Sequence, residues 1–276
     1  MSEPGVSSSM NISRLIAETM GEEMRRDARV LLIGEDVGSS GGTFGASRGL
    51  HREFGEWRVR DTPISEMGFV GMGVGMAMSG LLPIVEIMFV DFIGVCLDPI
   101  VNAAAKNRYM SGGSVGVPIT FRAAAGCIGV AAQHSQCLWG TLAHVPGLRV
   151  VAPSNPADYR QMLGAAIRCE DPVFVLEHKD VYLRKVNSFP FGTDVSGEIR
   201  DDALVGARVV RPGSDISLVA LSTMVERALE AAEHLQEQGV SAEVVDLRSV
   251  VPLDMATVCE SVARTQRLLV IDEDYR

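Results

Sequence analysis

Apolar residues along this chain follow two alternating patterns: the spacing of an amphipathic helix, and short continuous runs rich in β-branched residues. The first spacing predicts helices over 11–26, a glycine-rich segment from Glu66, 97–110, 155–168, 223–238 and 254–264. The short runs predict strands over 30–33, 84–89, 117–122, 148–152, 173–177, 207–210, 216–221, 242–247 and 268–271. Strand and helix alternate throughout, which predicts an α/β fold with a parallel sheet between helices.

A polar, irregular stretch divides the chain into two parts. Residues 185–205 are predicted to be a linker between a first domain, 11–184, and a second domain, 206–276. Residues 1–10 carry neither pattern and are predicted to be disordered. The second domain would have only about 70 residues, which is small for an α/β domain. We therefore expect it to be incomplete in this chain or covered by a partner.

One acidic side chain, Glu66, stands at the entrance of an apolar, glycine-rich segment. Because Thr62, Pro63 and Ser65 precede it, the simplest interpretation is a carboxylate that favours the positive end of a helix dipole. Small residues at 68, 71, 75 and 79 form one stripe on the predicted helix, which lets another backbone or a flat ligand approach closely. A carboxylate that loses solvent beside such packing can hold or pass a proton.

The same segment admits a second interpretation, a membrane span. The charge-free window 67–85 is just long enough to cross a bilayer, and its small-residue spacing resembles a transmembrane packing face. Against this, Pro83 interrupts the run, Glu86 and Asp91 follow it, and no cluster of Lys or Arg flanks either end. We expect a buried helix followed by a strand, and no membrane partner.

Net charge, cysteine spacing and the N-terminal sequence limit the binding partners and the cellular location that we expect. The formal net charge of −10 disfavours nucleic acid or an anionic membrane surface as a partner. The five cysteines are scattered and lack paired spacing, which predicts reduced thiols and a cytoplasmic location. The N-terminal sequence has no basic region leading into an apolar core, so no signal peptide is expected.

Two glycine-rich segments and one histidine are weaker candidates for ligand binding or catalysis. Residues 38–45 lack the Lys and Ser/Thr of a P-loop and are predicted to form a mobile loop. The sequence Gly71-Met72-Gly73 falls inside a predicted helix, whereas a dinucleotide fingerprint needs a strand-to-helix turn. His134 lies in a loop after a strand, where side chains reach a pocket, and a structural role for it is equally supported.

Cysteines close to His134 allow two minor hypotheses. Cys127, His134, Cys137 and His144 are possible zinc ligands, but their spacing matches no standard structural site. Cys137 as a nucleophile with His134 as its base would make a thiol hydrolase, although no known motif surrounds them.

Seven segments together resemble one enzyme family. They are DTPISEMGF, PIVEIMFVDF, NAAAKNRYMSGG, GVAAQHSQ, HVPGLRVVAPSNP, DPVFVLEHK and EVVDLRSVVPLD. In this order they resemble the beta subunit of the thiamine-diphosphate-dependent decarboxylating component of 2-oxo acid dehydrogenase complexes, over nearly the whole chain. The resemblance implies a transketolase-type pyrimidine-binding domain followed by a transketolase C-terminal α/β domain. It also implies an oxidoreductase subunit that transfers an acyl group to lipoamide.

The resemblance assigns roles to individual residues. Glu66 would bond the ring nitrogen of the cofactor's aminopyrimidine and so activate it, and Phe92 would stack on that ring. His134 matches a histidine that lies near the substrate and assists proton transfer. Family members also hold a structural potassium ion, mainly through carbonyl groups. The matching positions here are Ile119, Ala166, Cys169 and Asp171.

A motif that the chain lacks points to a partner. Thiamine-diphosphate enzymes hold the diphosphate and magnesium with a Gly-Asp-Gly sequence, which does not occur here. The resemblance therefore implies an alpha subunit that carries this motif, a second beta subunit and a lipoyl acyltransferase core. Segments such as MFVDFIGVCLD look closest to acetoin dehydrogenase beta subunits, so pyruvate, a branched-chain 2-oxo acid and acetoin stay open as substrates. A non-catalytic, beta-like scaffold is a further alternative.

Overall fold

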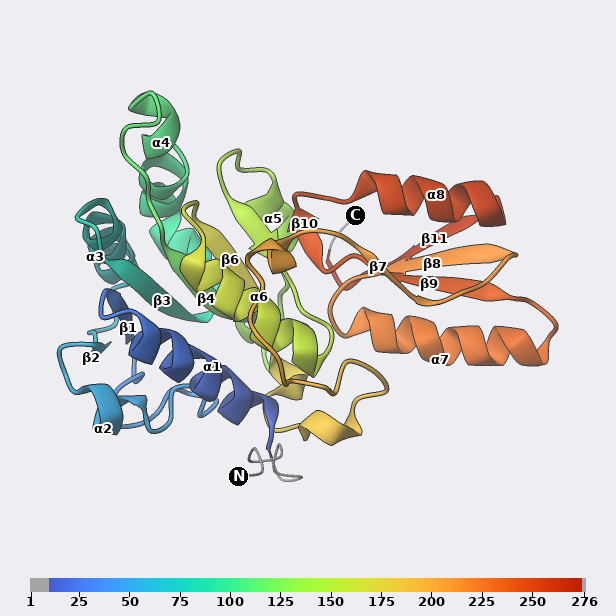
Figure 1. Ribbon diagram of the computed structural model, residues 1–276, viewed down its shortest axis with the longest axis horizontal. Helices are drawn as coiled ribbons and strands as arrows, with labels where there is room; N and C mark the ends of the chain where they lie inside the picture. The colour runs from blue at the N-terminus through green and yellow to red at the C-terminus, as the bar shows by residue number, and fades with distance from the viewer. Residues whose placement is uncertain (1–9, 275–276) are drawn as a thin grey trace.

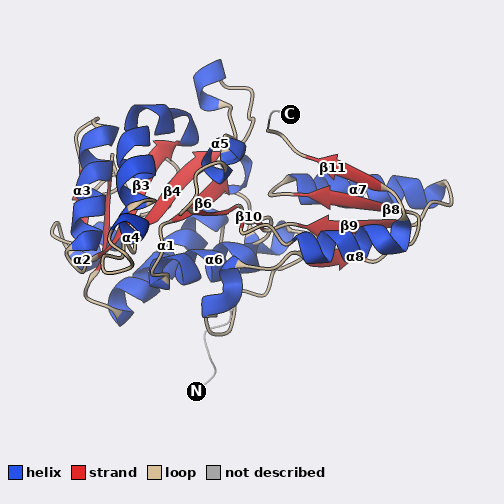
Figure 2. Cartoon of the chain, turned by 90° about the horizontal axis from the view of Figure 1, so that it is seen from above, coloured by secondary structure: helices blue, strands red, loops and turns tan. Residues whose placement is uncertain are grey.

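The computed structural model describes residues 10–274, so the segment 1–10 that was predicted to be disordered lies, apart from Met10, outside the described residues. The described chain forms two α/β units, each with a central sheet and helices on both faces (Figures 1 and 2). The α/β class predicted from the alternating pattern is confirmed.

The first sheet has seven strands in the order β10-β5-β6-β4-β3-β1-β2. They are β1 (Val30–Gly34), β2 (Val59–Asp61), β3 (Leu82–Phe89), β4 (Thr120–Ala125), β5 (Arg149–Val151), β6 (Val173–His178) and β10 (Ser249–Val251). Neighbouring strands are parallel, except that β10 pairs antiparallel with β5. The carboxyl ends of the parallel strands therefore meet at one edge, where such sheets bind their ligands.

Helices cover both faces of the first sheet. One face carries α1 (Ile12–Arg26) and α6 (Pro156–Arg168). The other carries α3 (Glu66–Met78), α5 (Trp139–Ala143) and a 3-10 segment, Val90–Cys96. Two short helices, α2 (Leu50–Phe54) and α4 (Asn107–Met110), complete the domain.

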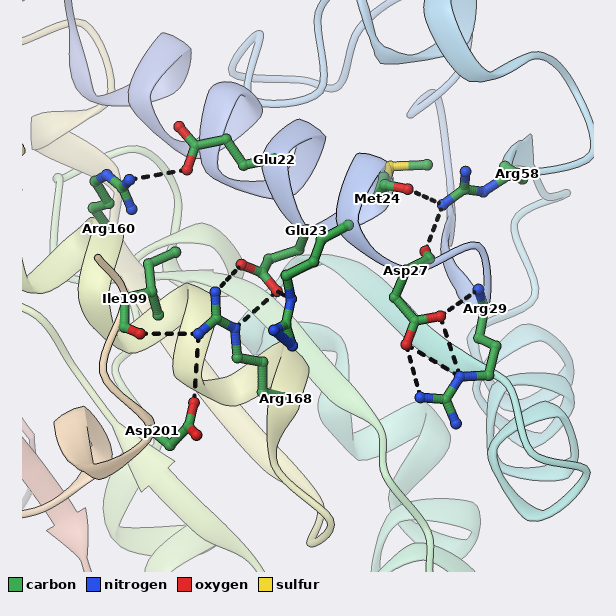
Figure 3. Close-up of polar contacts among 11 residues, drawn as sticks. Glu22, Glu23, Met24, Asp27, Arg29, Arg58, Arg160, Arg168, Ile199 and Asp201 are labelled. Carbon is green, nitrogen blue, oxygen red and sulfur yellow. Dashed lines mark hydrogen bonds and ion pairs between the residues drawn. The ribbon is translucent and has the colours of Figure 1, made fainter. Parts of the chain in front are cut away.

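Two arginines of α6 bind acidic side chains of α1 (Figure 3). Arg168 donates hydrogen bonds to Glu23 at 2.6 and 2.9 Å, and Arg160 pairs with Glu22 at 2.9 Å. Arg168 also donates to the carbonyl of Ile199, which lies in the segment after the first domain. These contacts fix the two helices relative to each other and to that segment.

The second sheet has the order β11-β8-β9-β7. Its strands are β7 (Arg208–Arg211), β8 (Ile216–Ala220), β9 (Ala242–Asp246) and β11 (Leu268–Ile271), and its faces are covered by α7 (Met224–Glu237) and α8 (Met255–Thr265). Between β9 and α8 the chain returns to the first sheet as β10, so the two domains share a strand pairing. Buried polar contacts support this junction: Ser154 donates to Asp246 at 2.5 Å, and Arg248 donates to Asp158 at 2.8 Å.

Two predicted elements differ from the structure, each at a proline. The predicted helix 97–110 is wrong as a single α-helix, because a π-helix occupies Pro99–Ala104 and separates Leu97 and Asp98 from the α-helical segment Asn107–Met110. Pro99 has no N–H and so cannot donate a helical hydrogen bond. The strand predicted from 117 begins at Thr120, since Pro118 cannot donate to the ladder.

The segment 185–205 is irregular, as predicted, but it packs against the first domain. It contains two short 3-10 turns, Val186–Ser188 and Asp201–Leu204. Its apolar side chains join the core beneath α1 and α6; these are Val186, Phe189, Val195, Ile199, Ala203 and Leu204. The connection is therefore a packed part of the fold.

The membrane interpretation finds no support. Within residues 10–274, no helix is both long and apolar enough to cross a bilayer. The apolar segment after Glu66 forms the 13-residue helix α3, and β3 follows it.

Candidate active site

Glu66 is the first residue of α3, and its side chain is buried. Ser65 occupies the N-cap position but makes no capping bond with its side chain. Only 9% of Glu66 is exposed, and no group within residues 10–274 donates a hydrogen bond to its carboxylate. The positive end of α3 favours the charge. The Glu66 oxygens are not among the fully buried unpaired atoms of the described chain, so the carboxylate keeps an acceptor that a ligand can reach.

Glu35, which follows β1, is a second buried carboxyl group at the same edge. Burial and the nearby charges of Glu66 and Asp36 raise the pKa of Glu35. Its Oε1 atom is buried and has no hydrogen-bond partner in the described part of the chain. Burial and the charge of Glu66 also raise the pKa of the Cys96 thiol to about 12. Glu35 and Cys96 are therefore poorly solvated, and both lie close enough to Glu66 to respond to its charge.

Phe92 and His134 lie together in a group of aromatic rings. Their ring centroids are 5.7 Å apart with the planes nearly perpendicular, and Phe89 contacts both, at 5.7 Å from Phe92 and 4.8 Å from His134. Phe92 belongs to the same 3-10 segment as Cys96, and this segment packs on α3. The structure thus brings all three residues expected in the active site, Glu66, Phe92 and His134, to the carboxyl edge of the first sheet.

The glycine-rich loop 38–45, predicted to be mobile, is held against this edge. The ring of Phe44 stacks on Tyr182 with centroids 4.4 Å apart, and the N–H of Gly38 donates to Asp61 at 2.6 Å. Within the loop, the N–H of Gly42 donates to the carbonyl of Asp36.

A buried charged network joins the strands that carry the site. Arg122 on β4 donates to both oxygens of Glu177 at 2.7 and 2.6 Å, and to Glu86 on β3 at 2.6 Å. Tyr182 donates to Glu177 at 2.8 Å. Burial raises the pKa of Glu86, although the charge of Arg122 opposes this change. The network fixes β3, β4 and β6 relative to one another.

The small-residue stripe of α3 faces outward. A side chain at Gly75 would meet nothing within 4 Å, and one at Gly71 would only touch Pro99 at 4.0 Å. The closest approach to the sheet is instead at Gly73, where an added Cβ would lie 2.6 Å from Val85. Three methionines are exposed along the helix, namely Met67, Met72 and Met78. The outer face of α3 is therefore small, apolar and open.

The structure gives no support to the thiol hydrolase hypothesis. The ring of His134 contacts Phe89 and Phe92, and the sulfur of Cys137 lies against Cys127 and Glu273. Burial and the charge of Glu273 raise the pKa of Cys137, whereas an activated nucleophile needs a lowered one. For zinc, the cluster found within residues 10–274 is Cys127, Cys137 and Glu273, without His134 or His144.

The expected potassium positions lie at the opposite, amino edge of the sheet. The carbonyls of Ile119 and Ala166 each accept one backbone hydrogen bond, which leaves each a free lone pair. The side chain of Asp171 pairs with Arg108 and Arg149. A cavity of about 570 Å³ adjoins Cys169, and the cationic residues that line it are Arg26, Arg29, Arg108 and Arg168. A potassium site at Ile119, Ala166, Cys169 and Asp171 stays a prediction.

The sequence analysis gave no role to Glu35, which follows the predicted strand 30–33, and it missed the network around Arg122. An acidic pair directly after a buried strand was the available signal for Glu35. For the network, the signal was three charged residues, Glu86, Arg122 and Glu177, within otherwise apolar strands.

The fold and this edge define a two-domain protein of transketolase type. Residues 8–184 match the family model of the transketolase pyrimidine-binding domain, and residues 206–276 match that of the transketolase C-terminal domain. A solved structure described as a split-gene transketolase, an inactive beta4 tetramer, superposes with a TM-score of 0.76 over 96% of this chain and 80% of that one. At 22% identity, that likeness shows the fold alone.

Closer relatives identify the family. The beta subunit of acetoin:2,6-dichlorophenolindophenol oxidoreductase from Cupriavidus necator is 44% identical over 96% of this chain and 79% of its own length. The mitochondrial beta-1 subunit of the pyruvate dehydrogenase E1 component from Oryza sativa is 45% identical over 96% of this chain and 71% of its own length. The chain belongs to this family of pyruvate dehydrogenase E1 and acetoin oxidoreductase beta subunits. Membership implies a subunit of a thiamine-diphosphate-dependent oxidoreductase that works with an alpha partner.

Proposed function

We propose that this chain is the beta half of a thiamine-diphosphate active site that decarboxylates a 2-oxo acid and passes the acyl group to lipoamide. The observation that carries the proposal is the buried carboxylate of Glu66, which has no donor within residues 10–274 and lies at the same edge as the ring of Phe92. A carboxylate with a free acceptor and a flat aromatic face fit the pyrimidine half of the cofactor.

When bound, thiamine diphosphate supplies a carbanion-forming centre that the protein itself lacks. Glu66 would hold a proton at the pyrimidine ring nitrogen, and the low-dielectric surroundings that it shares with Glu35 strengthen that interaction. Phe92 would hold the ring plane. His134, against Phe89 and Phe92, would move a proton at the substrate side.

We further propose that an alpha subunit completes the site. This chain has no Gly-Asp-Gly sequence, so the magnesium ion and the diphosphate need ligands from another polypeptide. The open face of α3, with Gly71 and Gly75 uncovered, suits close packing by such a partner. The proposed assembly also includes a second beta subunit, the lipoyl acyltransferase core and a potassium ion. We propose a cytoplasmic location because all five cysteines are free.

Acetoin cleavage with acetyl transfer to lipoamide is the second candidate. Its support is the likeness to acetoin oxidoreductase beta subunits from Cupriavidus necator and Bacillus subtilis, both 44% identical to this chain. The pyruvate dehydrogenase relatives match equally well, and in the proposed assembly the alpha subunit lines much of the substrate pocket. The scaffold alternative is the outcome in which no cofactor binds.

Calorimetry tests the proposal. Thiamine diphosphate with magnesium is titrated into the chain alone and into the chain mixed with an alpha subunit that carries Gly-Asp-Gly. We expect binding in the mixture alone. The reconstituted pair is then assayed with pyruvate, a branched-chain 2-oxo acid and acetoin, with lipoamide as acceptor. Absence of binding in the mixture would favour the scaffold alternative, and binding to the isolated chain would contradict the shared site.

A further inference from the structure

Two cysteines and a glutamate from distant parts of the chain meet between the two domains. Cys127 and Cys137 lie at the two ends of the loop that carries His134, and Glu273 follows β11 of the second domain. Their ligand atoms, two sulfurs and one carboxylate oxygen, all lie within 4.8 Å of one another. Both cysteines are free thiols.

Two of the three distances within this cluster match the edges of a metal coordination tetrahedron, and the third is no longer than 4.8 Å. The two sulfur atoms are 3.9 Å apart, and the sulfur of Cys137 lies 3.4 Å from Oε2 of Glu273. A zinc–sulfur bond of about 2.3 Å in tetrahedral geometry places two sulfurs about 3.8 Å apart and a sulfur and a carboxylate oxygen about 3.5 Å apart. A metal ion therefore fits with little movement, whereas a disulfide requires the sulfurs to approach to about 2.05 Å.

Neighbouring residues hold the carboxylate in the orientation that a metal ligand needs. Nδ1 of His178 accepts the N–H of Asp180 at 3.2 Å, which leaves the ring proton on Nε2 to donate to Glu273 at 3.1 Å. The N–H of Cys127 also donates to Oε2 of Glu273, at 3.1 Å. At Gly126 any side chain would collide with the His178 ring, and φ is +104°, so glycine permits this arrangement.

A route for an ion also exists. Cys127 is exposed and, together with Glu273, lines a cavity of about 280 Å³. Cys137 is buried, so the cluster has one accessible side and one protected side. Once both thiols lose their protons the three groups carry three negative charges, and a divalent ion cancels two of them.

We propose that Cys127, Cys137 and Glu273 form a binding site for a thiophilic divalent cation, with zinc as the fitting ion and a fourth position open to the cavity. Thiolate ligands select zinc over magnesium or calcium. Binding releases the two thiol protons, and the ion takes their place between sulfur and carboxylate. Because Glu273 belongs to the second domain, the ion would tie the loop that carries His134 to that domain.

The test measures zinc binding to the full chain after treatment with a chelator and a thiol reductant. Zinc is titrated against a competing chromophoric chelator, and cobalt is used as a spectroscopic probe of thiolate ligation. We expect one zinc per chain and a thiolate-to-cobalt charge-transfer band, with no change on adding excess magnesium. Zinc should also protect Cys127 from alkylation.

Variants identify the ligands. Cys127→Ser, Cys137→Ser and Glu273→Gln should each weaken zinc binding by at least about 10²-fold, because loss of an outer-shell group alone costs 10- to 100-fold. Cys259→Ser, which removes another exposed thiol, is the matched control and should bind like the unaltered chain. Should Cys137→Ser fail to fold, the exposed Cys127→Ser decides alone. A reduced chain that binds no zinc, or Cys127→Ser that binds it with unchanged affinity, would overturn the site.

Discussion

Replacing Arg122 with methionine should remove a large part of the free energy of unfolding of the first domain. The guanidinium is 1% exposed and lies 2.6 Å from a carboxylate oxygen of Glu86 and 2.6 Å from one of Glu177. Methionine fills similar space but leaves two buried carboxylates without a cation. Breaking a buried pair in this way costs about 3–5 kcal/mol, out of a total of roughly 5–15 kcal/mol for a typical domain.

The cost should depend on pH in a defined direction. Without Arg122, the burial that raises the pKa of Glu86 acts without an opposing positive charge, so the pKa of Glu86 in the folded state lies further above that of the unfolded chain. The folded variant then binds more protons than the unfolded chain, and its stability falls as pH rises. We expect the full loss near pH 8 and a smaller loss near pH 5.

Urea unfolding of the unaltered chain and the variant at both pH values measures this effect, from the midpoint and slope. Arg14→Met is the matched control, because Arg14 forms an exposed pair with Glu18 and should cost less than about 1 kcal/mol. Adding Glu86→Gln and Glu177→Gln to Arg122→Met should restore most of the loss. A cost near that of Arg14→Met, or a cost equal at pH 5 and pH 8, would refute the reasoning.

Three further predictions concern single carboxyl groups. Glu66→Gln should lower turnover of the reconstituted complex by about 10²- to 10⁴-fold in a steady-state assay with an unchanged urea midpoint; full turnover would remove the assignment. Glu35→Gln should stabilise the chain more at pH 8 than at pH 4, because the raised pKa of Glu35 makes the folded state lose stability as pH rises; thermal unfolding at both pH values checks this. Burial raises the pKa of Asp246 to about 7, so stability should fall as pH rises from about 4 to about 7 with a slope of up to about 1.4 kcal/mol per pH unit. Asp246→Asn should flatten that slope, and an unaltered slope in thermal unfolding would contradict the origin assigned to it.

Helix and strand positions were predictable wherever the apolar pattern was long and unbroken. The helix predicted over 155–168 is α6, Pro156–Arg168, and the strand predicted over 173–177 is β6, Val173–His178. The strand β2 and the helix α5 were not predicted, because β2 contains two charged residues among three and α5 is too short to show a helical repeat. The strand β10 could not be predicted for a different reason, since it lies in the second domain by sequence and pairs with the first.

Individual residues of the candidate site were predictable from the sequence, but the contacts between residues far apart in the sequence were not. Glu66 stood out because it is the charge at the head of a charge-free run, and the resemblance supplied Phe92 and His134. Strand register, which a sequence pattern does not contain, places Glu86 beside Arg122. In the same way Glu273 reaches Cys137 from 136 positions away, so the spacing of cysteines and histidines alone suggested the wrong ligand set.

Buried carboxyl groups near the carboxyl edge of the first sheet are of two kinds: some are paired with a cation of the same chain, and others are not. Glu86 and Glu177 are matched within the chain by Arg122, so that part of the fold satisfies its own charges. Glu35, by contrast, has a buried oxygen without a hydrogen-bond partner in the described part of the chain, and burial together with the charges of Glu66 and Asp36 raises its pKa. A folded chain can retain a buried carboxyl group of this kind when a ligand or a partner subunit supplies the missing hydrogen-bond donor. Glu66 begins α3 on the buried face of the helix, whereas its neighbours Ser65 and Met67 are exposed, so a partner that covers the amino end of α3 would lie beside the Glu66 carboxylate.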